Sequence, residues 1–133
     1  MISRIIQGGF KGSDAMKMFK NYLNIEMTKG DTLSFGIEIY DLGQELDSAY
    51  FTCKQNFDDD IYIFQKSLNN GITLDKYDED GNYYYKVRVA PNDTQGLENG
   101  KYYYDLQIEA NGDVFTILKG ILTLEFDVIQ RWG

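Results

Sequence analysis

The most regular feature of the chain is a two-residue alternation of apolar or aromatic positions with polar ones. In Thr32–Tyr40, the side chains of Leu33, Phe35, Ile37 and Ile39 fall on one face. Successive side chains of a β-strand point to opposite faces, so this pattern predicts a strand with one buried face. Three more segments give inward-facing sets: Ala49, Phe51 and Cys53 in Ser48–Gln55; Tyr83, Tyr85, Val87 and Val89 in Tyr83–Val89; and Tyr102, Tyr104, Leu106 and Ile108 from Tyr102 onward.

Four further segments have weaker patterns but are also predicted to be strands. They are Leu23–Thr28, Ile61–Ser67, Ile72–Leu74 and Val114–Phe126. In the last one the apolar positions change face, and Gly120 predicts a β-bulge there. Asn-Gly or Asp-Gly pairs, which tolerate the positive φ of tight hairpin turns, recur at residues 70–71, 80–81, 99–100 and 111–112. The chain is therefore expected to be all-β: an antiparallel sandwich of seven or eight strands.

The N-terminal stretch has a different pattern. Ser13 can cap a short helix over residues 14–22, in which Met16, Phe19 and Leu23 share one stripe. Residues 1–12 have no sheet partner that the pattern identifies. We expect residues 1–22 to form an arm that is either loosely tied or docked on a neighbouring subunit, and residues 23–133 to form the sandwich domain.

Composition narrows the range of functions. The chain has 133 residues and a net charge of -8, which disfavours nucleic acid and anionic membrane surfaces as partners. It has no histidine, so it lacks the usual near-neutral general base and the commonest metal ligand. Cys53 is the sole cysteine and is expected in the core, where nothing lowers its pKa. We therefore predict no catalytic residue, no cofactor and no metal site, and we do not expect an enzyme.

Two acidic loops were candidates for metal binding or carboxylate chemistry. Asp75–Asn82 fits the EF-hand pattern poorly, because Lys76 and Val87 fall where the first and twelfth ligands belong. Asp58–Asp60 places three mutually repelling carboxylates together, which favours a solvated loop. A carboxylate pair for glycoside hydrolysis would have to come from such loops, and the sequence does not show that any two carboxylates lie close enough.

Four tyrosines alternate away from the predicted core: Tyr40, Tyr50, Tyr84 and Tyr103. Exposed aromatic rings on a sheet can stack on sugars or anchor protein interfaces. The alternative is that these residues are present only because β-strands favour tyrosine. The four tyrosines are our candidate interaction surface.

The segment Asp93–Leu106 resembles the corner before strand F of immunoglobulin-like domains, where a tyrosine hydroxyl bonds to upstream backbone. The resemblance implies that Tyr102 is the corner tyrosine and that Tyr104 takes the place of the second disulfide cysteine. It further implies that Phe51 or Cys53 packs against Tyr104 from the opposing sheet, so that packing replaces the disulfide.

One branch of that fold gives a closer match. The stretches Gly30–Phe35, Gly100–Ile108 and Thr116–Leu124 are similar to immunoglobulin-like domains of phage tails and baseplates, including the N-terminal domain of upper baseplate proteins. This resemblance implies a non-catalytic structural or assembly protein that binds other tail or baseplate proteins or copies of itself. It also implies assembly in the bacterial cytoplasm and a final location in the virion. The alternative is a carbohydrate-binding or host-attachment module that uses the exposed tyrosines.

Replacing the corner tyrosine tests its assignment. Tyr102→Phe removes the hydroxyl, and a hydrogen bond is worth about 1 kcal/mol net, so the variant is expected to lose roughly that much stability. Thermal or urea unfolding measures the loss. A melting midpoint equal to that of the unmodified protein would count against the corner.

Overall fold

The computed structural model describes residues 2–6, 15–18 and 21–125, and in this part of the chain it is almost entirely β-structure. The prediction of an all-β fold is confirmed. In chain order the elements are β1 (Ile2–Ile6), β2 (Ala15–Met18), β3 (Asn21–Tyr22), β4 (Ile25–Thr28), β5 (Leu33–Tyr40), β6 (Ser48–Lys54), β7 (Phe64–Leu68), β8 (Gly71–Tyr77), β9 (Tyr83–Val89), α1 (Pro91–Thr94), β10 (Gly100–Ala110) and β11 (Asp113–Glu125).

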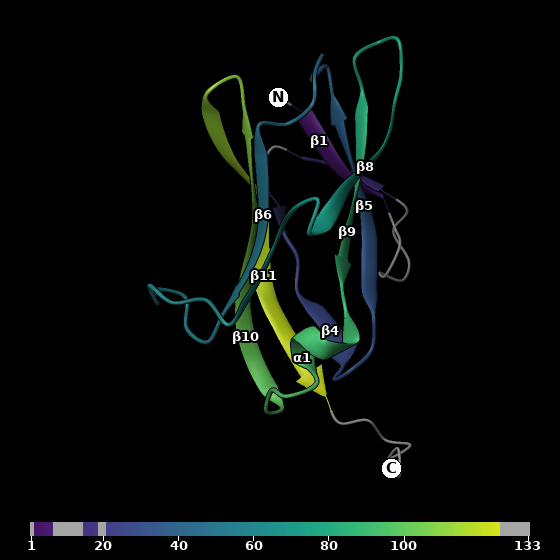
Figure 1. The fold of residues 1–133 in the computed structure, drawn as a ribbon. Helices are drawn as coiled ribbons and strands as arrows, with labels where there is room; N and C mark the ends of the chain where they lie inside the picture. The colour runs from purple at the N-terminus through teal and green to yellow at the C-terminus, as the bar shows by residue number, and fades with distance from the viewer. Residues whose placement is uncertain (1, 7–14, 19–20, 126–133) are drawn as a thin grey trace.

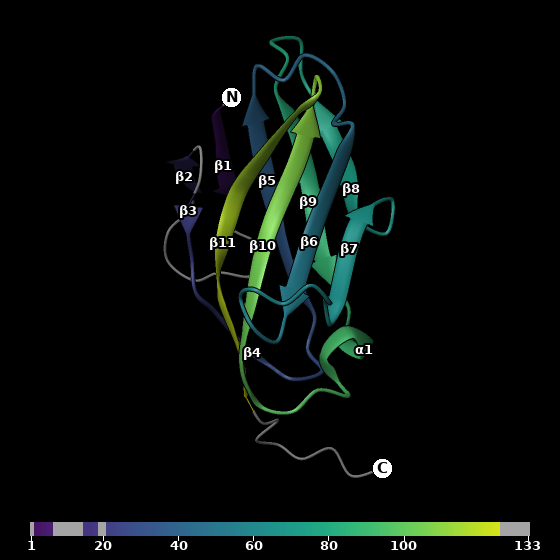
Figure 2. The same cartoon turned by 90° about the vertical axis from the view of Figure 1, so that its left-hand side faces the viewer.

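The strands form two layers that belong to one continuous sheet. The hydrogen-bonded order is β2-β1-β5-β9-β8-β7-β6-β10-β11-β3, and β4 also pairs with β11. In Figure 1, β6, β10 and β11 lie on one side of the molecule and β5, β8 and β9 on the other. Figure 2 turns the first layer toward the viewer, with β11, β10, β6 and β7 side by side in front. The sheet therefore folds over on itself where β7 meets β8.

Aromatic side chains from both layers fill the space between them. Phe35 of β5 meets Phe51 of β6 edge to face, with ring centroids 6.1 Å apart. Phe51 in turn stacks on Tyr104 of β10 at 5.2 Å. Phe51 or Cys53 was expected to face Tyr104 from the opposing sheet. This is wrong, because β6 pairs directly with β10 and places Cys53 opposite Tyr104 in the same layer. The aromatic that reaches this cluster from the other layer is Phe35.

The N-terminal segments differ from the expectation. The helix predicted over residues 14–22 is wrong for the residues that the structure describes, because Ala15–Met18 and Asn21–Tyr22 are strands. The segment expected to lack a sheet partner contains β1, which pairs with β5 and with β2. The capping residue Ser13 lies outside the described residues. Sheet pairing with a neighbouring strand overrides the local helical pattern here.

Two of the four predicted glycine turns close antiparallel hairpins. The turn at residues 80–81 joins β8 to β9, and Asn111 and Gly112 both take positive φ, 54° and 82°, between β10 and β11. The turn at 70–71 instead joins strands that pair in parallel over two positions, and the pair at 99–100 leads from α1 into β10.

The corner tyrosine and the short helix close the end of the sandwich where β10 begins. The Tyr102 hydroxyl donates to the Glu98 carbonyl at 2.7 Å, which is an upstream backbone bond of the kind expected of a corner tyrosine. In α1, the buried Thr94 hydroxyl accepts a hydrogen bond from the Gly30 amide at 2.9 Å. These two bonds connect the segment between β9 and β10 to β10 itself and to the turn between β4 and β5.

A β-bulge was predicted at Gly120, but this residue instead lies in close contact with the backbone of Leu23. The bulge lies at Ile117, where the β10–β11 register shifts and two consecutive residues, Ile117 and Leu118, are buried. A Cβ built on Gly120 would lie 2.7 Å from the Leu23 carbonyl carbon. Tyr104 is the Cα partner of Gly120 and donates its hydroxyl to the Leu23 carbonyl oxygen at 2.6 Å. The missing side chain thus lets the chain before β4 approach β11.

The glycine contact can be tested by adding one methyl group. Gly120→Ala is expected to destabilise the fold by about 1–3 kcal/mol, because the backbone of Leu23 must move and the bond from Tyr104 is disturbed. Gly96→Ala is the matched control, since nothing lies within 4 Å of the added Cβ there. Urea unfolding of both variants measures the difference, and equal midpoints would contradict the contact.

Candidate functional site

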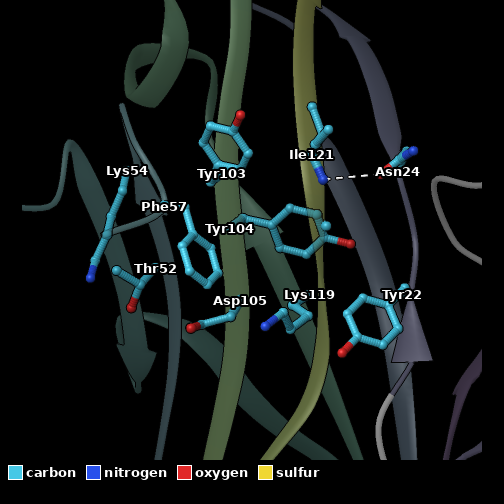
Figure 3. A pocket seen from close by; sticks show the side chains of 11 residues that line it. Tyr22, Asn24, Thr52, Lys54, Phe57, Tyr103, Tyr104, Asp105, Lys119 and Ile121 are labelled. Atoms are coloured by element: carbon cyan, nitrogen blue, oxygen red, sulfur yellow. Dashed lines mark hydrogen bonds between the residues drawn. The ribbon is translucent and has the colours of Figure 1, made fainter. Parts of the chain in front are cut away.

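A cleft of about 270 Å³ lies on the outer face of the layer formed by β6, β10 and β11. Its base consists of outward-facing residues in adjacent rows, because paired strands place side chains of the same parity side by side. One row is Lys54, Tyr103 and Ile121; the next is Thr52, Asp105 and Lys119. Figure 3 shows these side chains around the cleft.

Two aromatic residues from outside the central strands flank this surface. Tyr22 is on β3, which pairs in parallel with β11 next to Lys119. Phe57 comes from the loop between β6 and β7, which projects from this layer in Figure 1 and crosses in front of β10 and β6 in Figure 2. The Lys119 ammonium lies over both rings, 5.5 Å from the centroid of Tyr22 and 5.1 Å from that of Phe57. Cation–π attraction to the Lys119 ammonium therefore favours the positions of the Tyr22 and Phe57 rings on either side of the cleft.

Asp105 is the carboxylate of the cleft. Burial raises its pKa above the ordinary value, while the positive charges of Lys54 and Lys119 act in the opposite direction and offset only part of that effect. Within the described part of the chain, no hydrogen bond or ion pair to this carboxylate is found. Asp105 is thus a partly desolvated acceptor that is open to the hydroxyl or amide groups of a ligand.

The edge of the cleft next to β11 is fixed by the same contact that involves Gly120. Tyr104 lines the cleft and reaches across β11, as Figure 3 shows, to bond the Leu23 carbonyl. Asn24 accepts a hydrogen bond from the Ile121 amide at 3.1 Å, drawn as a dashed line in Figure 3. Burial raises the pKa of Tyr104 far above its ordinary value, so the phenol remains a donor at neutral pH. These bonds position the segment that carries Tyr22.

The structure separates the four tyrosines of the candidate interaction surface. Tyr103 lines the cleft, and Tyr50 lines a second hollow on the same layer. Tyr40 and Tyr84 are on β5 and β9, in the other layer, where Tyr40 donates to Glu38 and Lys76 lies over the Tyr84 ring. The four tyrosines therefore lie as two pairs on opposite layers, Tyr103 and Tyr50 on one outer face and Tyr40 and Tyr84 on the other.

The other sequence candidates are part of turns or of the core. The carboxylate of Asp78 accepts bonds from the backbone amides of Asp80 and Asn82, which close the β8–β9 turn and lower its pKa. Burial raises the pKa of the Cys53 thiol to about 12, so it is not a nucleophile at neutral pH. In the described ranges, no group of three or more His, Cys, Asp or Glu residues could hold a metal ion. No helix in this part of the chain is long and apolar enough to cross a membrane.

Comparison with known proteins gives a likeness in fold. No protein-family model and no curated protein matches the chain. Among solved structures, the chain is similar to a family 123 glycoside hydrolase from Clostridium perfringens, studied for glycolipid glycan hydrolysis, with a TM-score of 0.50 and 12% identity. The match covers 80% of this chain and 23% of the hydrolase chain. At this identity the likeness shows the fold alone.

This likeness corrects the expectation that the protein is not an enzyme. An all-β fold similar to this one occurs within a chain that hydrolyses glycans. That expectation rested on two arguments: the chain has no histidine, and the sequence does not show that any two carboxylates lie close together. Neither argument excludes catalysis in a fold that a glycoside hydrolase contains. The likeness to the hydrolase says nothing about phage tail or baseplate domains, so that resemblance stays a prediction.

The partly buried carboxylate of Asp105 predicts a pH-dependent stability difference. Because its folded pKa is raised, the ionised carboxylate destabilises the fold as the pH rises from the ordinary Asp value of about 3.9 through the folded pKa. Asp105→Asn is therefore expected to melt at a higher temperature than the unmodified protein at pH 7. The difference should disappear below the ordinary value, where the carboxyl is protonated in both states. Thermal melts across pH 3–8 measure it, and a lower melting temperature at pH 7 would contradict the assignment.

Proposed function

We propose that this chain is a glycan-binding domain and that the cleft over β6, β10 and β11 is its binding site. The observation that supports this proposal is the combination of aromatic rings and polar groups over one sheet face, where the described residues give Asp105 and Lys54 no hydrogen bond or ion pair. Tyr22, Phe57 and Tyr103 supply the rings, and Asp105 and Lys54 supply an acceptor and a donor. These five residues come from β3, the β6–β7 loop, β10 and β6.

The chemistry of a sugar ring suits such a cleft. A sugar presents C–H faces, which pack on aromatic rings, and hydroxyl groups at its rim, which donate to carboxylates and accept from ammonium groups. The cleft, at about 270 Å³, is slightly smaller than typical pockets for drug-sized ligands, which run from roughly 300 Å³ upward. It therefore suits a single sugar unit better than a large cofactor.

The likeness in fold to a glycoside hydrolase also supports a function that involves glycans. The hydrolase from Clostridium perfringens acts on glycolipid glycans, and this chain matches about a quarter of its length. Glycan hydrolysis is thus the second candidate function. It is favoured by Asp105, because a carboxyl group whose pKa is raised by burial is suited to act as a general acid.

The resemblance to phage tail domains suggests where such a domain would act. In a tail or baseplate, a glycan-binding module would recognise sugars on the bacterial surface, which is the host-attachment role that the sequence offered as an alternative. Tail or baseplate proteins and further copies of this chain then remain the proposed protein partners. The neighbouring genes test this setting, since tail genes on both sides would support it.

A glycan array followed by calorimetry tests the proposed function. We expect saturable binding of one class of glycan and a loss of at least about tenfold in affinity for Tyr103→Ala, since the ring faces the cleft. Tyr84→Ala, which removes an outward tyrosine from the opposite layer, is the matched control and should bind normally. Release of free sugar from the bound glycan, lost in Asp105→Asn, would extend the function to hydrolysis. Absence of binding to any glycan would refute the proposal.

A further inference from the structure

A second hollow of about 240 Å³ lies on the same outer face as the cleft. It is lined by the next outward residues of β6 and β10, in two rows: Tyr50 beside Gln107, and Ser48 beside Glu109. Val114 of β11 completes it. No outward row separates the hollow from the cleft, because the row of Tyr50 directly follows the row of Thr52 and Asp105 along the strands.

We infer that the hollow is a second sugar subsite and that the cleft and the hollow together bind an extended oligosaccharide along β10. This inference rests on the proposed function. The centres of the two sites are about four residues apart along the strand, which is roughly 14 Å at 3.4 Å per residue. That distance exceeds one sugar ring, so a ligand that occupies both sites is a chain of sugars.

The hollow offers the same kinds of contact as the cleft. The Tyr50 side chain is 41% exposed and Val114 is 63% exposed, so both present apolar surface that a sugar face can cover. Glu109 supplies a carboxylate, and its Oε1 accepts a hydrogen bond from the Ser48 hydroxyl at 3.2 Å. Gln107 adds an amide to the lining of the hollow, so acceptor and donor groups line it together with the ring.

The cleft and the hollow are both built on strand β10. β10 is the central strand of this layer and pairs along its length with β6 and β11. Its inward residues Leu106 and Ile108 are fully buried between the layers. The distance between the two sites is therefore set by a strand that cannot slide without moving the core, and a rigid spacing favours a ligand of matching length.

Affinity as a function of chain length tests the second subsite. The probe is the length series, from one to six sugar units, of the array glycan with the strongest signal, such as chito-oligosaccharides. We expect affinity to rise by about tenfold or more once the chain spans both sites. Tyr50→Ala should abolish this gain for the hexasaccharide and change monosaccharide binding less than twofold. Tyr103→Ala should weaken every length.

The outcomes distinguish a failure of the second subsite from a failure of the proposed glycan-binding function. If the hexasaccharide binds Tyr50→Ala as tightly as it binds the unmodified protein, the second subsite is wrong while the glycan-binding function stands. If no glycan of any length binds, the proposed function itself fails. Val114→Ser provides an independent variant should Tyr50→Ala fail to fold, and it is expected to reduce the length-dependent gain in the same way.

Discussion

The pairing of β10 with β6 on one side and β11 on the other is the constraint on which the rest of the molecule depends. This pairing fixes which side chains of β10 point inward, and so it fixes both the core and the outer surface. Tyr104 and Leu106 pack between the layers, while Tyr103 and Asp105 face the cleft. A shift of one residue would exchange the two sets, exposing the core and burying the carboxylate. Cys53 is a free, buried cysteine, so this register is maintained by the backbone hydrogen bonds of the sheet and by packing.

The central strands could be predicted from the sequence because their signal is local. The alternation in Tyr83–Val89 gave the observed bounds of β9, and the inward residues of β5, β6 and β10 are buried as expected. The N-terminal segments could not be predicted, because β1 and β2 are strands only through pairing with each other and with β5. Gly120 was likewise misinterpreted, since a close approach by Leu23, nearly a hundred residues away, leaves no local pattern.

The candidate site was only partly visible in the sequence. Tyr103 was identified by its outward position, but its partners in the cleft come from distant segments: Tyr22 through the parallel pairing of β3, and Phe57 through a loop that folds back over the sheet. The alternation along β10 implies an outward position for Asp105, but the sequence does not show that its carboxylate is partly desolvated, because its burial and the nearby Lys54 and Lys119 depend on neighbouring strands. The acidic segment Asp75–Asn82, which already fitted a calcium loop poorly, contains the β8–β9 turn, as the hydrogen bonds of Asp78 show.

The position of Phe57 on the loop between β6 and β7 has a consequence for how the cleft can change during evolution. Tyr103 and Asp105 belong to β10, whose other face is the core, so the register of the strand fixes their positions. Phe57 stands on a surface loop with 67% of its side chain exposed, and it touches the charge on Lys119 without contributing to the buried cluster. Lengthening or rewriting that loop would reshape one wall of the cleft at little thermodynamic cost. Substitutions in the loop would thus change the shape of the cleft while the strands preserve the fold.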